Sequence, residues 1–139
     1  MKLVMVFGAF DGLHPGHLDF FKQAKKYGDK LLVSVGTDGN VEKIKGKKPL
    51  FSQTERLALV DNCRIVDKAV IGAEDNFFEN IASYEPDVIC LGYDQWAEDK
   101  DVKESLKDVG LKSTQVIRLK PYAQKRAKSS IAKVKSVDF

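Results

Sequence analysis

Five short apolar segments alternate with segments of helical periodicity along the chain, and this alternation constrains the fold more than any other feature. The apolar segments are continuous rather than alternately polar, as in strands that are covered on both faces. They are residues 2–7, 30–35, 68–71, 88–91 and 115–119. Continuous apolar strands that alternate with helices predict an α/β fold, a Rossmann-like parallel five-stranded sheet with helices on both faces.

Capping and turn residues mark the ends of the expected helices. Gly28 suits the end of the first helix, and Ser52 with Glu55 three residues later forms a capping box at the start of the second. We expect helices over residues 16–27, 52–63, 76–84, 101–109 and 129–137, and a turn over residues 36–40. Ligands bind beyond the carboxyl ends of parallel strands, so the loops after the first, second, fourth and fifth strands form the candidate site.

The length of 139 residues matches one domain of ordinary size. No apolar stretch is long enough to cross a bilayer, and the N-terminus lacks the pattern of a signal peptide. The two cysteines, Cys63 and Cys90, form neither a disulfide framework nor the pattern of a zinc site. We therefore expect a single domain over residues 1–139, in the cytoplasm, with reduced thiols and no membrane partner.

Positive charge is concentrated at the C-terminal end of the chain. Residues 112–139 carry eight basic groups against one acidic group, whereas residues 1–111 carry 15 basic groups against 19 acidic ones. A basic segment on a mildly acidic body indicates either a contact with an anion or a solvated helix face. Charge alone leaves both interpretations open.

The loop after the first strand contains both histidines of the chain, three residues apart. Pro15 suits the first turn of a helix. This places His14 in the loop and His17 on the first turn, near free N–H groups and the positive end of the helix dipole. Such a site can hold a phosphate and stabilise charge that grows on its oxygens. The competing interpretations are a capping histidine beside a packed one, or a metal pair, for which this spacing lacks further ligands.

Four stretches of the chain resemble motifs of one family. Gly8-Ala9-Phe10-Asp11 followed by His14-Pro15-Gly16-His17 resembles the GxFDxxHxGH signature of the cytidylyltransferase-like nucleotidyltransferases. Three further stretches are similar to other motifs of that family: Lys45-Gly46-Lys47-Lys48-Pro49 with Glu55-Arg56, Leu91-Gly92-Tyr93-Asp94-Gln95, and Lys128-Ser129-Ser130-Ile131. The resemblance covers essentially the whole chain and is closest to the archaeal FAD synthase and glycerol-3-phosphate cytidylyltransferase branches.

The resemblance implies transfer of a nucleoside monophosphate from a nucleoside triphosphate to a phosphorylated acceptor, with release of pyrophosphate. It implies that His14 and His17 contact the α- and β-phosphates, and that Lys45 and Lys48 contact the transferred or acceptor phosphate. Arg56 is expected to contact the triphosphate or to support the loop. The competing interpretations are a solvated charge run for the lysines and a surface ion pair for Arg56.

The nucleotide-binding residues that the resemblance implies are Ala9, Phe10, Asp11, His14, His17, Arg56, Gly92, Asp94, Lys128, Ser129 and Ser130. A divalent metal ion, Mg²⁺, is expected with the triphosphate, and Asp11 is either its ligand or a turn residue. Asp94 is likewise either a substrate contact or a turn residue. The C-terminal motif departs from the family pattern Arg-Thr-x-Gly-x-Ser-Thr because it lacks the glycine. Its serines at a helix start still present hydroxyl and N–H groups to the β- and γ-phosphates.

The resemblance favours ATP as the nucleotide and FMN as the acceptor, which gives FAD. Phe10, Phe51, Tyr93 and Trp96 then supply an aromatic-lined slot for the flavin ring, or else pack in the interior. The competing functions are transfer from CTP to glycerol-3-phosphate, transfer from ATP to a sugar phosphate such as heptose phosphate, and a non-catalytic nucleotide- or nucleic-acid-binding module. Nucleic acid is disfavoured, and a homodimer is expected by analogy with the family.

Overall fold

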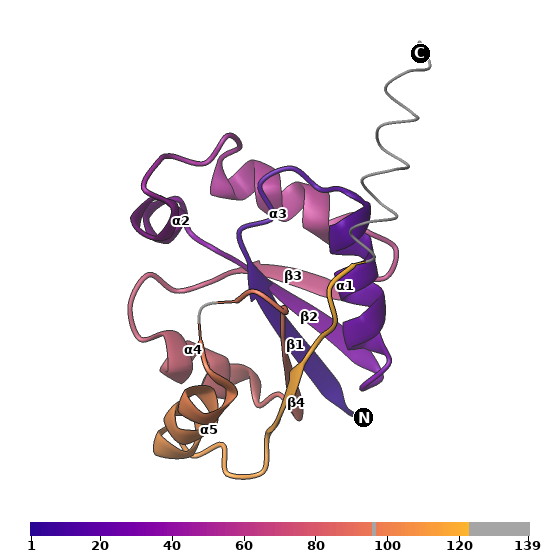
Figure 1. Cartoon of the computed structure of the whole chain (residues 1–139), viewed down its shortest axis with the longest axis vertical. Coiled ribbons are helices and arrows are strands. Elements are labelled where there is room, and N and C mark those ends of the chain that lie inside the picture. Colours follow the sequence, from indigo (N-terminus) through magenta and orange to yellow (C-terminus); the bar gives the residue numbers. More distant parts are fainter. Residues whose placement is uncertain (96, 123–139) are drawn as a thin grey trace.

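A computed structural model of the protein describes residues 1–95 and 97–122. Its strands form one parallel sheet: β1 (Leu3–Gly8), β2 (Lys30–Val35), β3 (Lys68–Ile71), β4 (Val88–Leu91) and β5 (Gln115–Arg118). Its helices are α1 (Pro15–Lys25), α2 (Asp38–Lys45), α3 (Gln53–Asp61), α4 (Phe77–Tyr84) and α5 (Asp99–Asp108). The predicted Rossmann-like α/β class is confirmed (Figure 1).

The strand order β3-β2-β1-β4-β5 creates a switch point between β1 and β4. The chain adds β2 and β3 on one side of β1, then returns to add β4 and β5 on the other. In open α/β sheets, ligands bind beyond the carboxyl ends of the strands at such a point. The loops after β1 and β4 are therefore the two walls of the candidate site.

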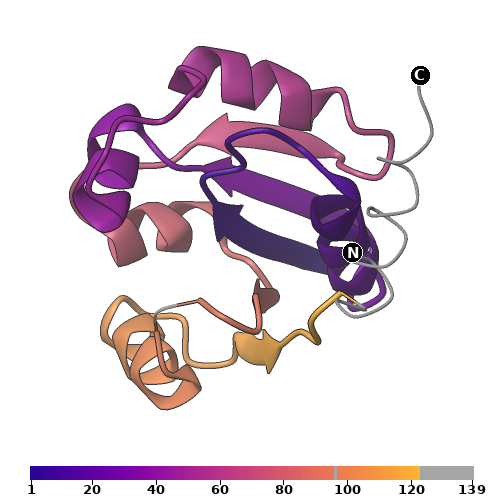
Figure 2. The ribbon, with the colours of Figure 1, turned by 45° about the horizontal axis from the view of Figure 1, so that its top comes forward.

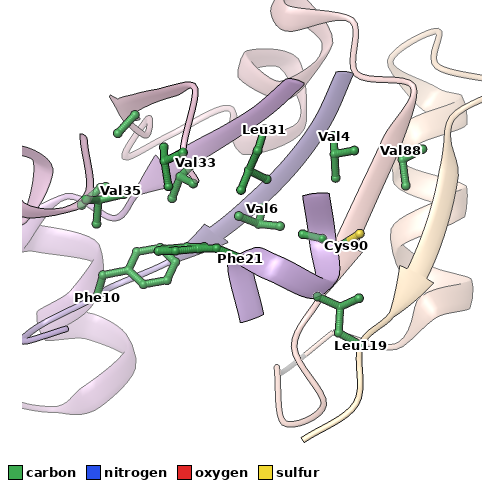
Figure 3. Close-up of a cluster of buried hydrophobic side chains, with 14 residues drawn as sticks. Val4, Val6, Phe10, Phe21, Leu31, Val33, Val35, Val88, Cys90 and Leu119 are labelled. Atoms are coloured by element: carbon green, nitrogen blue, oxygen red, sulfur yellow. The ribbon is translucent and has the colours of Figure 1, made fainter. Parts of the chain in front are cut away.

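Two apolar cores cover the two faces of the sheet, because successive side chains of a strand point to opposite faces. In β1, Val4 and Val6 pack with Phe21 of α1 and Val60 of α3. Met5 packs on the opposite face, in a core with residues of α4 and α5. Figures 1 and 2 show α4 and α5 on the other side of the sheet from α1 and α3. Figure 3 shows the core between the sheet and α1. The predicted helices on both faces are thus confirmed.

Helix α2 lies where the sequence predicted a turn over residues 36–40, and that prediction is wrong from residue 38 onward. Thr37 caps the helix by accepting a hydrogen bond from Asn40 N–H at 3.2 Å, and Gly46 ends it at φ 75°. The residues Asp-Gly-Asn favour turns in isolation, but the cap and the burial of Val41 stabilise the first helical turn. Figure 2 shows α2 beyond the carboxyl end of β2.

The other predicted strands and helices are present, and their ends differ from the prediction by no more than two residues. The capping box at Ser52 and Glu55 is confirmed by both of its hydrogen bonds. The helix predicted over residues 129–137 lies outside the described residues. No helix in residues 1–95 or 97–122 is long and apolar enough to cross a membrane.

Candidate active site

The loop after β1 is held by a buried aromatic ring. Phe10 has φ 51°, in the left-handed region that a bulky residue rarely adopts, and its ring centroid lies 5.2 Å from that of Phe21 (Figure 3). The ring folds back over Gly8, where a Cβ would lie 2.7 Å from Phe10 Cζ. The expectation that the Phe10 ring lines a flavin slot is therefore wrong, because the side chain is buried in the core. A ligand can meet the loop here through its backbone.

His14 and His17 form a reciprocal cap at the start of α1. Gly16 N–H donates to His14 Nδ1 at 3.0 Å, and His14 N–H donates to His17 Nδ1 at 3.2 Å. The two ring centroids lie 3.9 Å apart. An Nδ1 atom that accepts a hydrogen bond carries no proton, so each neutral ring has its N–H at Nε2. The pair therefore offers two neighbouring Nε2–H donors to an anion.

The backbone donors at the start of α1 are used within this cap. Pro15 has no N–H, Gly16 N–H is bonded to His14, and His17 N–H donates to the His14 carbonyl at 2.9 Å. The prediction of free backbone N–H groups at this helix start is therefore wrong, because His14 occupies them. An anion here meets the imidazole N–H groups and the positive end of the helix dipole.

His17 is neutral at pH 7. Burial is the main cause that lowers the pKa of His17 from its ordinary value of 6.5 to about 4. Electrostatic interactions with His14 and Lys45 lower it in the same direction. His17 consequently acts as a neutral hydrogen-bond donor rather than as a cation.

Asp11 joins the loop after β1 to the segment between α2 and α3. Its Oδ2 accepts from Leu50 N–H at 2.6 Å, and its Oδ1 accepts from Phe51 N–H at 2.8 Å. Burial acts to raise the pKa of Asp11, but these hydrogen bonds and the charges of Arg56 and Lys45 hold it below its ordinary value. Asp11 is thus an ionised carboxylate that fixes this segment against the histidine loop.

The lysine-rich segment begins at the last residue of α2. Lys45 is exposed, and it lies close enough to lower the pKa of both Asp11 and His17. Lys48 is also exposed, three residues further along the segment. The structure therefore brings the charge of Lys45 to the histidine loop.

Arg56 on α3 is fully buried and connects three loops. Its Nη1 donates to the carbonyls of Ala9 at 2.9 Å and Gly36 at 2.8 Å, and its Nε donates to the carbonyl of Phe51 at 3.0 Å. Its Nη2 pairs with Asp38 Oδ1 at 2.8 Å. Of the two expected roles, triphosphate contact and loop support, these contacts correspond to the second. The interpretation as a surface ion pair is wrong because the side chain is buried.

The loop after β4 forms the other wall of the switch point. Gly92 is buried directly after the strand, and its N–H donates to Gln95 Oε1 at 2.7 Å. A Cβ on Gly92 would lie 3.3 Å from Gln95 Cγ, so glycine permits this close approach. Asp94 and Tyr93 are exposed on the same loop, where they are accessible to a ligand.

Arg118 at the end of β5 holds this loop from the neighbouring strand. Its Nη1 donates to the carbonyls of Gly92 at 2.7 Å and Gln95 at 3.2 Å. Its Nη2 bonds the carbonyl of Ala97 and pairs with Asp99 Oδ1 at 2.7 Å. Arg118 is one of the basic groups for which the sequence indicates an anion contact or a solvated face. The structure corrects this for Arg118, whose charge is paired within the fold.

Of the predicted site residues not yet placed, Phe51 lies within the described structure and the other four lie outside it. Phe51 is partly buried at the segment that Asp11 holds. Trp96 lies outside the described residues, as do Lys128, Ser129 and Ser130. The described chain ends at Tyr122, whose Cβ lies 3.9 Å from the position of a Cβ added to Gly16. The C-terminal segment thus follows a residue that lies beside the start of α1.

Asp11 is the residue that the sequence offers as a possible ligand of a metal ion. Both Asp11 oxygens already accept backbone N–H groups. In residues 1–95 and 97–122, no three His, Cys, Asp or Glu side chains are grouped so that they could hold a metal ion. Mg²⁺ keeps several waters and binds through few carboxylates when substrate phosphates are present.

Three site residues carry roles that the sequence did not predict: Asp38, Gln95 and Arg118. Gln95 lies within a stretch that resembles a family motif, and this position just after a strand was the available signal. Asp38 and Arg118 act through residues distant in sequence, on Arg56 and on the loop after β4. No local pattern indicates such contacts.

The strand order and the histidine pair at the switch point define a Rossmann-like α/β protein with imidazole N–H donors beyond the carboxyl end of β1. Residues 5–135 match the family described as Cytidylyltransferase-like. The FAD synthase of Thermoplasma acidophilum is 36% identical over 139 residues, which cover 100% of this chain and 96% of that protein. The FAD synthase of Picrophilus torridus is 40% identical over 119 residues, 86% of this chain and 84% of that protein.

Solved structures agree with this match. The lipopolysaccharide core biosynthesis protein from Thermoplasma volcanium has a TM-score of 0.83 and 35% identity, and the alignment covers 88% of this chain and 98% of that one. A pantoate-β-alanine ligase from Francisella tularensis shares the fold, with a TM-score of 0.55 and 16% identity over 98% of this chain and 70% of that one. The chain therefore belongs to the cytidylyltransferase-like family.

Proposed function

We propose that this protein is an FAD synthase, an adenylyltransferase that converts ATP and FMN to FAD and pyrophosphate. One observation carries the proposal: proteins named FAD synthase are 35–41% identical to this chain over most of both sequences. The histidine pair at the switch point supports it, because the reaction requires charge stabilisation on phosphate oxygens.

The reaction is an in-line displacement at the α-phosphorus of ATP. An oxygen of the FMN phosphate forms the new bond to this phosphorus, and the bond from it to the oxygen that bridges to the β-phosphate breaks. That oxygen leaves with the electron pair as part of pyrophosphate. No side chain becomes covalently modified, so the protein contributes orientation and electrostatic stabilisation.

The geometry suggests a role for each residue near the histidine loop. We assign the Nε2–H groups of His14 and His17 to the α- and β-phosphate oxygens, where negative charge grows. Lys45 and Lys48 would contact the transferred and acceptor phosphates. Asp11 positions the segment that carries these lysines.

The remaining nucleotide contacts are assigned to three segments. Two segments would hold the nucleoside: the backbone at Ala9 and Phe10, and the loop with Gly92 and Asp94. Arg56 would support the backbone at Ala9, whose carbonyl it binds. In the C-terminal segment we propose contacts to the β- and γ-phosphates from Lys128, Ser129 and Ser130. ATP would bring Mg²⁺, which neutralises phosphate charge.

The proposal also includes the state of the whole protein. The family match over residues 5–135 supports one nucleotidyltransferase domain over residues 1–139. A homodimer in the cytoplasm is part of the proposal by family analogy alone. Light scattering on the purified protein measures directly whether it is a homodimer.

A second candidate function is adenylyl transfer to a sugar phosphate. The relative from Thermoplasma volcanium carries the name lipopolysaccharide core biosynthesis protein, and this observation favours the candidate. Cytidylyl transfer to glycerol-3-phosphate and non-catalytic nucleotide binding are the functions that the sequence also leaves open.

A pyrophosphate-release screen separates these functions. Each of the four nucleoside triphosphates is offered with FMN, glycerol-3-phosphate or heptose 1-phosphate. We expect release with ATP and FMN. Release only with a sugar phosphate or with CTP and glycerol-3-phosphate would move the protein to another branch of the family. Binding of triphosphate without release in any pair would indicate a non-catalytic module.

A further inference from the structure

The ladder between β1 and β4 stops before either strand ends. Its paired residues are Val4 with Val88 and Met5 with Ile89, although β1 continues to Gly8 and β4 to Leu91. Extending the same register by two residues places Phe7 opposite Leu91. The strands should therefore continue to bond there unless something separates them.

The next hydrogen bond of this ladder can be deduced from the neighbouring pair of strands. Leu91 is paired with Arg118, and the Leu91 carbonyl accepts from the N–H of the following residue, Leu119, at 2.8 Å. By the same parallel geometry, the Phe7 carbonyl would accept from Gly92 N–H.

The side-chain amide of Gln95 stands in the place of that bond. Gly92 N–H donates to Gln95 Oε1 at 2.7 Å, and Gln95 Nε2 donates to the Phe7 carbonyl at 3.0 Å. Both backbone groups are thus satisfied through an inserted amide, and β1 and β4 are separated by its width. Arg118 holds the Gln95 carbonyl at 3.2 Å, which fixes the backbone from which this side chain extends.

We propose that Gln95 is a positioning residue that keeps the switch point open for the nucleoside of ATP. The inference rests on the proposed function and deepens it. A primary amide suits this role because it accepts on one side and donates on the other, as a peptide group does. The loop after β1 and the loop after β4 then lie far enough apart for a nucleoside to enter between them.

The test compares Gln95→Ala and Gln95→Glu with the wild-type protein. Alanine removes the inserted amide, so Gly92 N–H and the Phe7 carbonyl can approach each other. Glutamate keeps the size but loses the donor to the Phe7 carbonyl. Thr114→Val is the matched control, because it removes a side-chain hydrogen bond to the Pro86 carbonyl near the other end of β4 and β5.

We expect the KM for ATP to rise about tenfold or more in both Gln95 variants, with a smaller change in kcat, because misplaced walls weaken binding. Thr114→Val should keep the wild-type KM. In a crystal structure of ligand-free Gln95→Ala, Gly92 N should lie within hydrogen-bond distance of the Phe7 oxygen.

Two results would overturn the proposal. One is a wild-type KM for ATP in Gln95→Ala, whatever its melting temperature, since Gln95 would then be structural only. The other is a raised KM with β1 and β4 still apart in the variant, which would make Gln95 a direct contact of ATP. If the wild-type protein makes no FAD, the proposed function fails, and calorimetric ATP binding with the same crystal structure still decides the role of Gln95.

Discussion

Backbone N–H groups at the start of α1 fix the tautomers of His14 and His17 as well as the positions of the two rings. Each Nδ1 atom accepts a backbone hydrogen bond of the cap, so the N–H of each neutral ring lies at Nε2. The low pKa of His17 keeps that ring neutral, and the neighbouring positive charge belongs to Lys45 instead. At the scale of single residues, His17 therefore donates a hydrogen bond without carrying a charge, and Lys45 supplies the charge.

We predict that His17 titrates with a pKa of about 4 in the folded protein, as measured by NMR of its ring carbons. Between pH 6.5 and about 4, the unfolded chain binds a proton at His17 that the folded chain does not. Stability from this group is therefore complete above pH 6.5 and is lost as the pH falls through this range. Lys45→Gln should raise the pKa of His17. A wild-type His17 that titrates near 6.5 would contradict the account.

We predict that His14→Ala and His17→Ala each lower kcat by roughly 10²–10³-fold, the usual cost of losing one preorganised transition-state donor. His14→Ala also removes an N-cap and should cost about 1 kcal/mol of stability. His14→Asn is the matched control, because asparagine is a good N-cap but lacks Nε2. It should restore stability without restoring turnover. Full turnover in His14→Asn would limit His14 to capping.

At the scale of elements, the strands could be predicted from the sequence because continuous apolar runs of Val, Leu and Ile are a local signal. Helix α2 could not, since Asp38, Gly39 and Asn40 favour a turn locally and the decisive contacts are tertiary. Asn40 Nδ2 donates to the Ala73 carbonyl at 3.1 Å, across the sheet edge. Thr37 as a cap and Gly46 as a stop were the signals available.

In the candidate site, too, local signals could be predicted from the sequence and tertiary contacts could not. The histidine pair was predictable because its residues lie three apart in one loop. The roles of Arg118 and Gln95 were not, because each depends on carbonyls or N–H groups brought together by the sheet. The burial of the Phe10 ring depends likewise on Phe21 of α1.

We predict that Gly8→Ala destabilises the protein by about 1–3 kcal/mol, because the new methyl group overpacks against the Phe10 ring. Urea unfolding measures this cost. In a Phe10→Leu background the same substitution should cost clearly less, since the ring is gone. Equal costs in the two backgrounds would show that the ring does not make glycine necessary at this position.

At the scale of the whole molecule, two arginines hold the walls of the switch point. Arg56 holds the loops after β1 and β2, and Arg118 holds the loop after β4. The sheet thus supplies the position of the crevice, and the arginines fix the loops that border it. Tyr122, the last described residue before the C-terminal basic segment, lies beside the start of α1.

We predict that a chain truncated after Pro121 binds ATP about tenfold or more weakly by calorimetry, because it lacks Lys128, Ser129 and Ser130. Loss of one charge-assisted hydrogen bond is sufficient for this effect. The double variant Lys103→Gln, Lys107→Gln is the charge control, since these lysines of α5 line a surface pocket with Ser113 and Thr114. A folded truncated protein with unchanged ATP affinity would indicate a solvated C-terminal segment.

The most direct test of the central claim follows the α-phosphate of ATP. The protein is incubated with FMN and ATP that is labelled at either the α- or the γ-phosphate, and the products are separated by chromatography. We expect the α-label in FAD and the γ-label in pyrophosphate, with both signals reduced roughly 10²-fold or more in His17→Ala. An α-label that stays in AMP or ADP, or that enters no flavin product, would contradict the assignment as an FAD synthase.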